Sequence, residues 1–467
     1  MSHSSLVREL RERLSDEVLL ITDPDVMAAY TRDRAPWVPS GIPAVIASPS
    51  HVDDVRRVLE IAAGHMVPVV PRGAGSGLSG AANAVDGCIV LSTHRLRAEP
   101  VVRPGDQLAH VAAGMMNAEV KQLAAGHGLF YPPDPASSAF CTIGGNVATN
   151  AGGLCCVRYG VTRDWVKKIE VVLPGGELVE FGSTTPKSVV GYDLAGLVVG
   201  SEGTLGVVTA ATLGLSQEKP GHATMVAYFD RLSDVGSAVI GCLQRPSRPA
   251  LLEVLDQTTL RAVESLRPMG LVTSAAALLI IQVVDDELSR SELAALASVC
   301  VDAGASETFS SADPAEADML IEARRLAFEA LERQGIPLLE DVCVDVTRLP
   351  ELLDRIQQIA AQHGVTVGTF GHAGDGNLHP IVVVENASEE ANLRGLAAFE
   401  AIMDVTLELG GTLSGEHGVG LLKQPFIERE LGPRTLELMA GVKQVFDPLS
   451  IMNPGKSIGS VSRQPVA

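Results

Sequence analysis

The sequence has few of the features expected of an iron–sulfur protein or a nucleic-acid-binding protein. Its seven cysteines include no C-x-x-C pair and are spread over 467 residues, whereas an iron–sulfur cluster needs about four thiolates. This spread indicates a reducing compartment and argues against a built-in cluster. Basic residues are also scarce, with 36 Lys and Arg against 56 Asp and Glu. The resulting net charge of −20 repels nucleic acids and anionic membrane surfaces, so we expect no nucleic-acid partner.

The sequence also lacks a long hydrophobic run. Its most apolar stretch, residues 275–284 (AAALLIIQVV), has about half of the roughly 20 residues that a membrane helix requires, and we predict a buried strand there. Residues 1–18 are charged throughout and lack the apolar core of a signal peptide. We therefore expect a cytoplasmic protein that is not integral to a membrane and that reaches a membrane only through a partner.

The length and composition indicate more than one globular domain. A chain of 467 residues with 46% hydrophobic and 20% charged residues predicts about two to four domains. Glycine-rich loops dominate up to about residue 218, and long helical patterns over 317–335 and 349–364 follow. We therefore place a boundary near residue 218, with 217–221 (QEKPG) as the crossing segment and a loose polar tail after Lys456. Before that boundary the patterns predict a helix over 53–64 and strands within 43–50, 67–70, 88–93, 165–181 and 205–215.

The first glycine loop matches a well-known dinucleotide fingerprint only in its letters. Residues 75–80 (GSGLSG) fit G-x-G-x-x-G, but a predicted strand follows within about seven residues instead of a helix. The helix N-terminus that would face a pyrophosphate is therefore missing, and we reject an NAD site. What remains is a loop whose backbone N–H groups can converge on an anion. A plain surface turn is the alternative.

Two further loops have the same character. Residues 132–153 (PPDPASSAFCTIGGNVATNAGG) and 191–209 (GYDLAGLVVGSEGTLGVVT) are rich in glycine and small polar residues. Such residues let a ligand lie close to the backbone. Three loops of this kind in one stretch suggest one long ligand, and a dinucleotide with a pyrophosphate centre and two ring systems would suit them.

A second group of residues indicates metal or acid–base chemistry. His372 and His379 flank a Gly-Asp-Gly-Asn sequence that requires a turn, so both imidazoles can be directed at one atom. With Glu416 they make a ligand set for Zn²⁺ or a similar divalent ion that keeps an open position. Asp375 could be a ligand instead, or simply a turn residue before glycine.

Two more side chains are candidates for direct contact with a substrate. His417 follows Glu416, and in an extended turn the two side chains point to different sides, which leaves His417 as an acid or base near neutral pH. Arg324 and Arg325 lie in the predicted helix 317–335 and could present a guanidinium to a carboxylate. A solvated helix face is the alternative for both arginines.

Six motifs, taken in order, resemble a known family. They are RGAGSGLSG, IGGNVATNAGG, GSEGTLGVVT, GHAGDGNLHP, SGEHGVGLLK and DPLSIMNPGK, and they span about residues 71–457. Together they resemble the FAD-dependent 2-hydroxy-acid dehydrogenases of the vanillyl-alcohol-oxidase superfamily, such as the FAD-binding chain of bacterial glycolate oxidase, D-lactate dehydrogenase and D-2-hydroxyglutarate dehydrogenase. The resemblance implies an α+β fold. Its parts are a two-subdomain PCMH-type FAD-binding domain (1–218), an α+β cap domain with the substrate site (219–445) and a tail returning to the FAD site (446–467).

The resemblance also implies which residues bind FAD. Some members of the superfamily attach FAD through a histidine in the first loop, and this loop has none, so we expect noncovalent FAD. The residues implied to bind it are Arg72, Gly73, Ala74, Gly75, Ser76, Gly77, Leu78, Ser79, Pro133, Asp134, Ser138, Thr142, Gly144, Gly145, Asn146, Thr149, Asn150, Gly152, Gly153, Tyr159, Gly160, Glu202, Gly203, Gly206, Val208 and Asn453.

The remaining roles follow from the metal-containing members of the family. The positions of His372, His379 and Glu416 there ligate the ion, which we expect to be zinc. The position of His417 acts as the base, and those of Arg324, His379 and His417 contact the substrate. In this chemistry the metal polarises the α-hydroxyl, the base removes its proton, and the Cα hydride passes to flavin N5.

The substrate and the electron acceptor are less constrained. Phe328 and Ile381 stand where hydroxyglutarate enzymes have polar contacts. Because an unpaired carboxylate is costly to bury, we favour glycolate or D-lactate over D-2-hydroxyglutarate. The acceptor is a quinone, a cytochrome, an electron-transfer protein or an iron–sulfur subunit, and a homodimer is compatible with the sequence. The alternatives are a subunit that is inactive without an iron–sulfur partner and a flavin-containing transferase without net redox chemistry.

Overall fold

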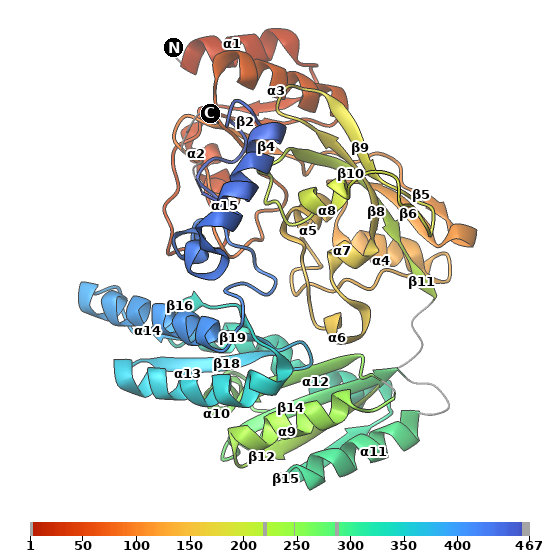
Figure 1. Cartoon of the computed structure of the whole chain (residues 1–467), viewed down its shortest axis with the longest axis vertical. Coiled ribbons are helices and arrows are strands. Elements are labelled where there is room, and N and C mark those ends of the chain that lie inside the picture. The colour runs from red at the N-terminus through yellow and green to blue at the C-terminus, as the bar shows by residue number, and fades with distance from the viewer. Residues whose placement is uncertain (1–2, 218–221, 247, 285–288, 460–467) are drawn as a thin grey trace. The chain divides into compact units, whose positions relative to one another are not determined.

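The computed structural model describes residues 3–217, 222–246, 248–284 and 289–459, which fall into two compact units (Figure 1). Unit 1 comprises Met1–Gly152, Val161–Glu218 and Glu416–Ala467, and unit 2 comprises Gly153–Gly160 and Lys219–Gly415. Each unit mixes helices with sheets, which confirms the expected α+β class. Residues 218–221 of the expected crossing segment and most of the polar tail after Lys456 lie outside the described residues.

Unit 1 is built around two larger sheets. The first has the strand order β1-β2-β4-β3, with β2, β3 and β4 parallel, and α1 and α3 contribute buried Leu10, Val55 and Leu59 to its core. The second is antiparallel, in the order β5-β6-β10-β8-β9, and α5 adds Ile143 and Val147 to its core. The elements are α1 (His3–Arg13), β1 (Leu19–Ile21), α2 (Pro24–Met27), η1 (Ala28–Tyr30), β2 (Val45–Ser48), α3 (Val52–His65), β3 (Val69–Arg72), β4 (Ile89–Ser92), β5 (Val101–Arg103), η2 (Pro104–Asp106), β6 (Leu108–Ala112), α4 (Asn117–Ala125), β7 (Leu129–Phe130), α5 (Ile143–Thr149), α7 (Thr162–Trp165), β8 (Val166–Val172), β9 (Leu178–Gly182), α8 (Leu194–Val198), β10 (Val207–Gly214), β11 (Ser216–Gln217), η4 (Gln424–Phe426) and α15 (Ile427–Phe446).

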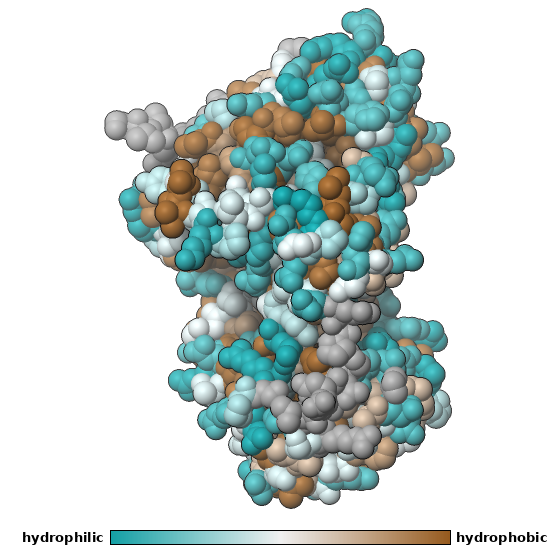
Figure 2. Space-filling model, turned by 90° about the vertical axis from the view of Figure 1, so that its right-hand side faces the viewer, coloured by the Kyte–Doolittle hydropathy of each residue, from teal (hydrophilic) through white to brown (hydrophobic). Residues whose placement is uncertain are grey.

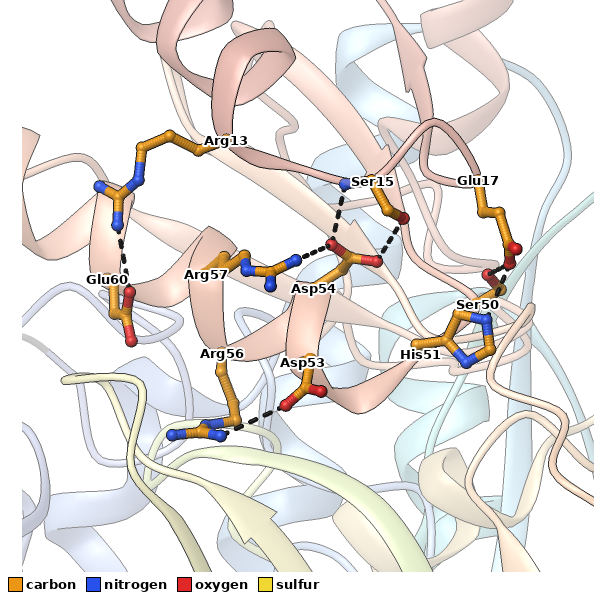
Figure 3. Close-up of polar contacts among 10 residues, drawn as sticks. All are labelled: Arg13, Ser15, Glu17, Ser50, His51, Asp53, Asp54, Arg56, Arg57 and Glu60. Carbon is orange, nitrogen blue, oxygen red and sulfur yellow. Dashed lines mark hydrogen bonds and ion pairs between the residues drawn. The ribbon is translucent and has the colours of Figure 1, made fainter.

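Polar contacts hold the N-terminal segment against α3. Asp53 and Asp54 lie in the first turn of α3, where a carboxylate is favoured by the helix dipole. The Asp54 carboxylate accepts hydrogen bonds from the backbone N–H and the hydroxyl of Ser15 and from Arg57 (Figure 3). The segment after α1 is therefore fixed to the helix that covers the first sheet.

Unit 2 contains one eight-stranded antiparallel sheet. Its order is β15-β12-β14-β13-β18-β19-β16, and β17 also pairs with β19. Helices α10 and α12 pack together, as do α9 with α11 and α13 with α14 (Figure 1). The elements are α6 (Cys156–Tyr159), β12 (His222–Phe229), α9 (Leu232–Leu243), β13 (Leu251–Asp256), α10 (Gln257–Leu266), β14 (Ala277–Val284), α11 (Ser289–Asp302), β15 (Ala305–Ser311), α12 (Pro314–Glu332), β16 (Ile336–Leu339), β17 (Val342–Cys343), η3 (Val346–Arg348), α13 (Leu349–His363), β18 (Thr366–His372), β19 (Asn377–Val384) and α14 (Glu389–Glu408).

Most of the predicted elements form, with shifted ends. The apolar stretch expected to be a buried strand is β14. Helix α3 continues past the expected stop at Gly64 to His65, and Met66 ends it in the left-handed conformation at φ 54°. Among the described helices, none is both long enough and apolar enough to cross a membrane. On the face drawn in Figure 2, hydrophilic residues cover much of the surface and hydrophobic residues gather in small patches between them.

Candidate functional site

The three glycine loops meet in unit 1 around α5. Gly73, directly after β3, lies so close to Thr142 that a Cβ on it would be 2.4 Å from Thr142 Oγ1. Thr142 is the N-cap residue of α5. In the third loop, the Glu202 N–H donates to the carbonyl of Ala148 at 2.7 Å. The predicted cofactor loops are therefore neighbours in space, although about 60 residues separate each from the next.

The first glycine loop, residues 75–80, has the backbone geometry of an anion site, and no helix follows it. Gly75 and Gly80 have φ values of 70° and 83°, and the chain reaches β4 without an intervening helix. The absence of a helix that argued against an NAD fingerprint is thus confirmed. Arg72 Nη1 and Ser79 Oγ are buried and have no hydrogen-bond partner among the described residues. A buried guanidinium nitrogen and a hydroxyl beside glycine backbone fit the pyrophosphate of FAD.

Glu202 of the third loop, which is predicted to contact the cofactor, also makes a contact inside unit 1. Its carboxylate is buried and accepts the N–H groups of Val419 at 2.5 Å and Gly420 at 2.9 Å. Burial raises the pKa of Glu202 to about 7, while those backbone hydrogen bonds oppose the rise. The Glu202 side chain therefore holds the turn that follows His417, a contact that no sequence pattern indicates.

The C-terminal segment lies against the first and third loops. Asn453 donates its N–H to the carbonyl of Val69 at 2.8 Å and its side-chain amide to the carbonyl of Glu202 at 2.6 Å. Lys456 is almost fully buried and donates to the carbonyl of Asn83 and to Asn453 Oδ1. Burial lowers the pKa of Lys456 to about 8. The sequence motifs predict no role for this lysine.

The other predicted cofactor residues are divided between the units. Pro133 accepts a hydrogen bond from buried Asn117 at 3.3 Å, and Asp134 pairs with Lys121. Gly153, Tyr159 and Gly160 belong to unit 2. The remaining predicted cofactor residues lie in unit 1, in or beside the three loops, and they are Ala74, Ser76, Gly77, Leu78, Ser138, Gly144, Gly145, Asn146, Thr149, Asn150, Gly152, Gly203, Gly206 and Val208.

In unit 2, the two predicted imidazoles lie side by side in a β-hairpin. His372 is the last residue of β18, and His379 lies in β19 opposite Phe370. Both are buried, and their ring centroids are 5.0 Å apart with the rings edge to face. The turn required by the Gly-Asp-Gly-Asn sequence is confirmed, but His379 belongs to a strand and not to the end of a loop.

Each imidazole has a buried carboxylate at its Nδ1 atom. Glu253 Oε1 is 2.6 Å from His372 Nδ1, and Asp341 Oδ1 is 3.7 Å from His379 Nδ1. Asn377 and Ser414 also donate to Asp341, both at 2.8 Å. Carboxylates in this position typically leave Nε2 as the metal-facing nitrogen. Neither carboxylate was identified from the sequence, although Glu253 stands out between Leu251 and Leu255 in the strand.

Two groups of side chains could hold a metal ion among the described residues. One set is His372, His379 and Glu416, and the other is Asp341, His379 and His417. The first group is the set predicted from the sequence, and its two nitrogens and one oxygen suit Zn²⁺. Asp375, the alternative ligand, belongs to neither group.

His417 does not point away from Glu416 as the spacing suggested. Its Nε2 is 3.8 Å from Glu416 Oε1. The glycines on either side of this pair allow a turn that an extended strand would not form. The two side chains therefore share one region, and His417 lies beside the predicted ligand instead of on the opposite side of the chain.

The two adjacent arginines of α12 have different environments. Arg324 is buried, donates from Nε to Glu253 Oε2 at 2.5 Å and lies 4.5 Å from the Phe370 ring centroid. Arg325 is exposed and lies near surface acidic residues. Phe328 and Ile381 pack in the apolar cluster of this face. Arg324, the buried arginine, is thus the better candidate for binding an anion. Apart from Glu253, the residues named around it are apolar.

Comparison with protein families places both units in one class of flavoenzymes. Residues 219–457 match the model for "FAD linked oxidases, C-terminal domain", and residues 43–182 match an FAD binding domain. The chain belongs to the FAD-linked oxidase family, as the six motifs predicted, and is an FAD-linked oxidoreductase.

Curated relatives cover nearly the whole chain. The glycolate oxidase subunit GlcD of Bacillus subtilis is 38% identical over 94% of this chain and 93% of its own length. The D-lactate dehydrogenase of Anaerostipes hadrus is 32% identical over 96% and 93%, respectively. The D-2-hydroxyglutarate dehydrogenase of Xanthomonas citri pv. viticola is 36% identical over 94% of this chain and 93% of its own length.

Solved structures show the same fold at low sequence identity. A p-cresol methylhydroxylase with bound substrate matches with a TM-score of 0.80 at 16% identity, covering 99% of this chain and 98% of that one. This likeness confirms the two-part FAD-binding fold expected from the motifs.

Proposed function

We propose that this protein oxidises a D-2-hydroxy acid to the 2-oxo acid with FAD as the redox cofactor. The observation that carries the proposal is the pair of buried imidazoles in unit 2, His372 and His379, whose ring centroids are 5.0 Å apart, in a chain of the FAD-linked oxidase family. Curated relatives named as glycolate oxidase subunit and D-lactate dehydrogenase support the substrate class.

FAD is held noncovalently by the three glycine loops of unit 1. Arg72 and Ser79 supply buried donors for its pyrophosphate, and the close contact of Gly73 with Thr142 keeps the loop backbones together. When bound, FAD would accept the hydride from the substrate Cα. No histidine stands in the first loop to form a covalent link.

The metal is a divalent ion, and its donor set fits zinc. His372, His379 and Glu416 would hold it, with the Glu253 carboxylate orienting the His372 ring and the Asp341 carboxylate 3.7 Å from His379 Nδ1. An ion there would polarise the α-hydroxyl of the substrate. A fourth position stays open in such a three-ligand site, as catalytic zinc requires.

Two side chains act directly on the substrate. His417 accepts the hydroxyl proton, because an imidazole exchanges protons near neutral pH. Arg324 binds the substrate carboxylate through its two Nη groups, because its Nε is used by Glu253. Together these contacts orient the α-carbon for loss of its hydride.

The substrate is a small or apolar-tailed acid, with glycolate and D-lactate favoured. Phe328 is partly buried and Ile381 is fully buried in an apolar cluster, so a second carboxylate would meet no polar partner there. D-2-hydroxyglutarate is the alternative, since a relative of that name is 36% identical.

A second candidate function is that of an FAD-binding subunit that needs an iron–sulfur partner. A relative named as a subunit supports it, and the seven cysteines of the sequence include no C-x-x-C pair of the kind that ligates a cluster. The partner would pass electrons to a quinone, a cytochrome or an electron-transfer protein, and would bring this cytoplasmic chain to a membrane where needed.

We also propose a homodimer, which size-exclusion chromatography with light scattering would test.

Anaerobic bleaching of the flavin tests the primary proposal. The purified chain, loaded with FAD and Zn²⁺, would be mixed with D- and L-lactate, glycolate and D-2-hydroxyglutarate while the flavin absorbance is followed. Bleaching by D-lactate or glycolate is expected. A flavin that stays oxidised with every acid would refute the proposal. Turnover by the isolated chain with an artificial dye would refute the need for an iron–sulfur partner.

A further inference from the structure

A charged residue, Glu253, stands among the apolar residues of β13, whose last residue is Asp256. All residues of this strand are buried, and Glu253 exposes 0% of its surface. Leu251 and Leu255, two positions away on each side, pack in one cluster with Ile321 of α12. Side chains alternate along a strand, so Glu253 faces α12 as well. A buried carboxylate is costly unless charged or hydrogen-bonding groups surround it, so its partners indicate its role.

The two carboxylate oxygens of Glu253 serve two different elements. Oε1 is 2.6 Å from Nδ1 of His372, the residue directly opposite on β18. Oε2 accepts the Nε–H of Arg324 on α12 at 2.5 Å. All three residues belong to unit 2. One side chain therefore bridges a proposed metal ligand and the proposed carboxylate anchor.

The contact with His372 fixes which ring nitrogen is available. With Nδ1–H donating to the carboxylate, Nε2 carries the lone pair that a metal ion needs. The register of β13 against β18 places the carboxylate directly across from this ring. The His372 ring can then neither flip nor change tautomer without removing the donor from the buried Oε1 atom of Glu253.

The contact with Arg324 fixes the plane of its guanidinium. Arginine has five N–H donors in a rigid fork, and Glu253 uses the one on Nε, which leaves the four on the two Nη groups. Arg324 forms no other hydrogen bond or ion pair with the described residues. The Phe370 ring, 4.5 Å from the guanidinium carbon, limits rotation out of that plane.

We propose that Glu253 is a positioning residue shared by the metal site and the substrate anchor. Its carboxylate sets the direction of His372 Nε2 and of the Arg324 Nη groups together, so metal affinity and substrate affinity depend on the same side chain. The inference rests on the proposed function, because it uses the roles proposed there for both partners. It adds a residue that touches neither the ion nor the substrate.

Asp256 offers a matched control for a merely structural role. It lies on the same strand, is equally buried, and accepts hydrogen bonds from the Thr259 N–H at 2.8 Å and from Gln357 at 3.0 Å. Among the described residues, Asp256 forms no hydrogen bond or ion pair with His372 or Arg324. Replacing either carboxylate by an amide removes a buried charge from β13, but only one replacement disturbs the bridge.

The test compares Glu253→Gln with Asp256→Asn in the full chain loaded with FAD. The Zn²⁺ dissociation constant would be measured by competition with a chromophoric chelator, and KM and kcat for D-lactate at saturating Zn²⁺. Glu253→Gln should weaken Zn²⁺ binding roughly 10- to 100-fold and raise KM by about tenfold, since a rotated guanidinium loses about one good hydrogen bond. Asp256→Asn should change both by less than about twofold, whatever its effect on stability.

The outcomes separate this inference from the proposed function. If the wild type binds Zn²⁺ tightly and Glu253→Gln binds it equally tightly, the inference is wrong and the proposed function is unaffected. Weaker Zn²⁺ binding with an unchanged KM would overturn the shared role. A wild type that binds no Zn²⁺ would overturn the proposed metal site and this inference with it. If Glu253→Gln does not fold, Glu253→Asp keeps the charge and shortens the reach, and unchanged values of both constants would again refute the bridge.

Discussion

The carboxylate of Glu202 accepts the backbone N–H of Val419, 217 residues later in the chain, at 2.5 Å. The same carboxylate also accepts the backbone N–H of Gly420. The third glycine loop of unit 1 thus fixes the backbone just after His417. This link joins a loop proposed to hold FAD to the segment that carries the proposed base.

The buried Glu202 should make stability depend on pH. A carboxyl with a pKa of about 7 in the folded state and about 4.3 when unfolded binds its proton more tightly when folded. The free energy of unfolding should therefore fall as the pH rises from about 4.5 to 7. The side chain of Glu202→Gln does not titrate. As the pH rises from about 4.5 to 7, the free energy of unfolding of this variant should therefore improve, relative to that of the wild type, by up to about 3 kcal/mol.

Thermal unfolding at pH 5 and pH 8 checks this prediction. Glu177→Gln, at an exposed position, is the control and should change the melting temperature little at either pH. An equal effect of Glu202→Gln at both pH values would contradict the prediction.

His417→Ala should abolish flavin reduction and leave FAD bound. Loss of a general base typically costs 10²- to 10⁴-fold in rate, and the proposed FAD contacts do not include His417. Stopped-flow measurement of anaerobic flavin bleaching with D-lactate gives the rate, and the flavin absorbance per chain gives the FAD content. The exposed His127 provides a control substitution to alanine. Reduction at a near-normal rate would remove His417 as the base.

Substitutions at the metal site should separate its two candidate ligand groups. Elemental analysis is expected to find about one divalent ion per chain, and His372→Ala should lose it. Glu416→Gln should lose most of the metal, while Asp341→Asn should lower affinity roughly 10- to 100-fold, as expected for a residue that orients a ligand. The reverse order of effects would assign the ion to Asp341, His379 and His417. Active protein without metal would defeat both groups.

Gly73→Ala should release FAD. The added methyl carbon would lie 2.4 Å from Thr142 Oγ1, a distance at which the two loops must separate. Gly64→Ala, in α3, has open space around the new methyl and should retain FAD while stabilising the helix by up to about 1 kcal/mol. The FAD content of the purified variants, measured from their absorption spectra, tests this prediction. Full flavin occupancy in Gly73→Ala would mean that the loops do not grip the cofactor as proposed.

The substrate preference should follow the apolar surroundings of Arg324. We expect kcat/KM for D-lactate to exceed that for D-2-hydroxyglutarate by on the order of 100-fold or more, because the distal carboxylate of the larger acid would be buried without a partner. Steady-state rates with an artificial dye provide the comparison. A higher value for hydroxyglutarate would show that another part of the chain supplies the missing polar contact.

Local patterns predicted much of the architecture. The apolar run 275–284 became β14, and the helical patterns became α12 and α13, because hydrophobic period and length are local properties of the sequence. The Gly-Asp-Gly-Asn turn also brought His372 and His379 together, since a tight hairpin places its two strands side by side. Helix ends were less predictable, as Met66 shows by adopting the left-handed conformation where Gly64 was expected to stop α3.

Contacts between distant segments could not be predicted in the same way. Glu253 reaches His372 across 119 residues and Arg324 across 71, and only the strand register and the packing of α12 bring them together. The resemblance to a family supplied roles for His372 and Arg324 but not for the side chain between them. A charged residue with leucines two positions away on both sides was the only local sign.

The backbone contact between Val69 and the segment Ile451–Asn453 has a consequence for biosynthesis. Val69 is synthesised before residues 219–415 of unit 2, whereas the segment that lies along β3 is synthesised after them. The nascent N-terminal part must therefore wait, with this edge of its sheet uncovered, until all of unit 2 has been translated. Insertion of the flavin nucleotide is then an event that follows synthesis of unit 2, and chains that terminate within unit 2 should accumulate without it.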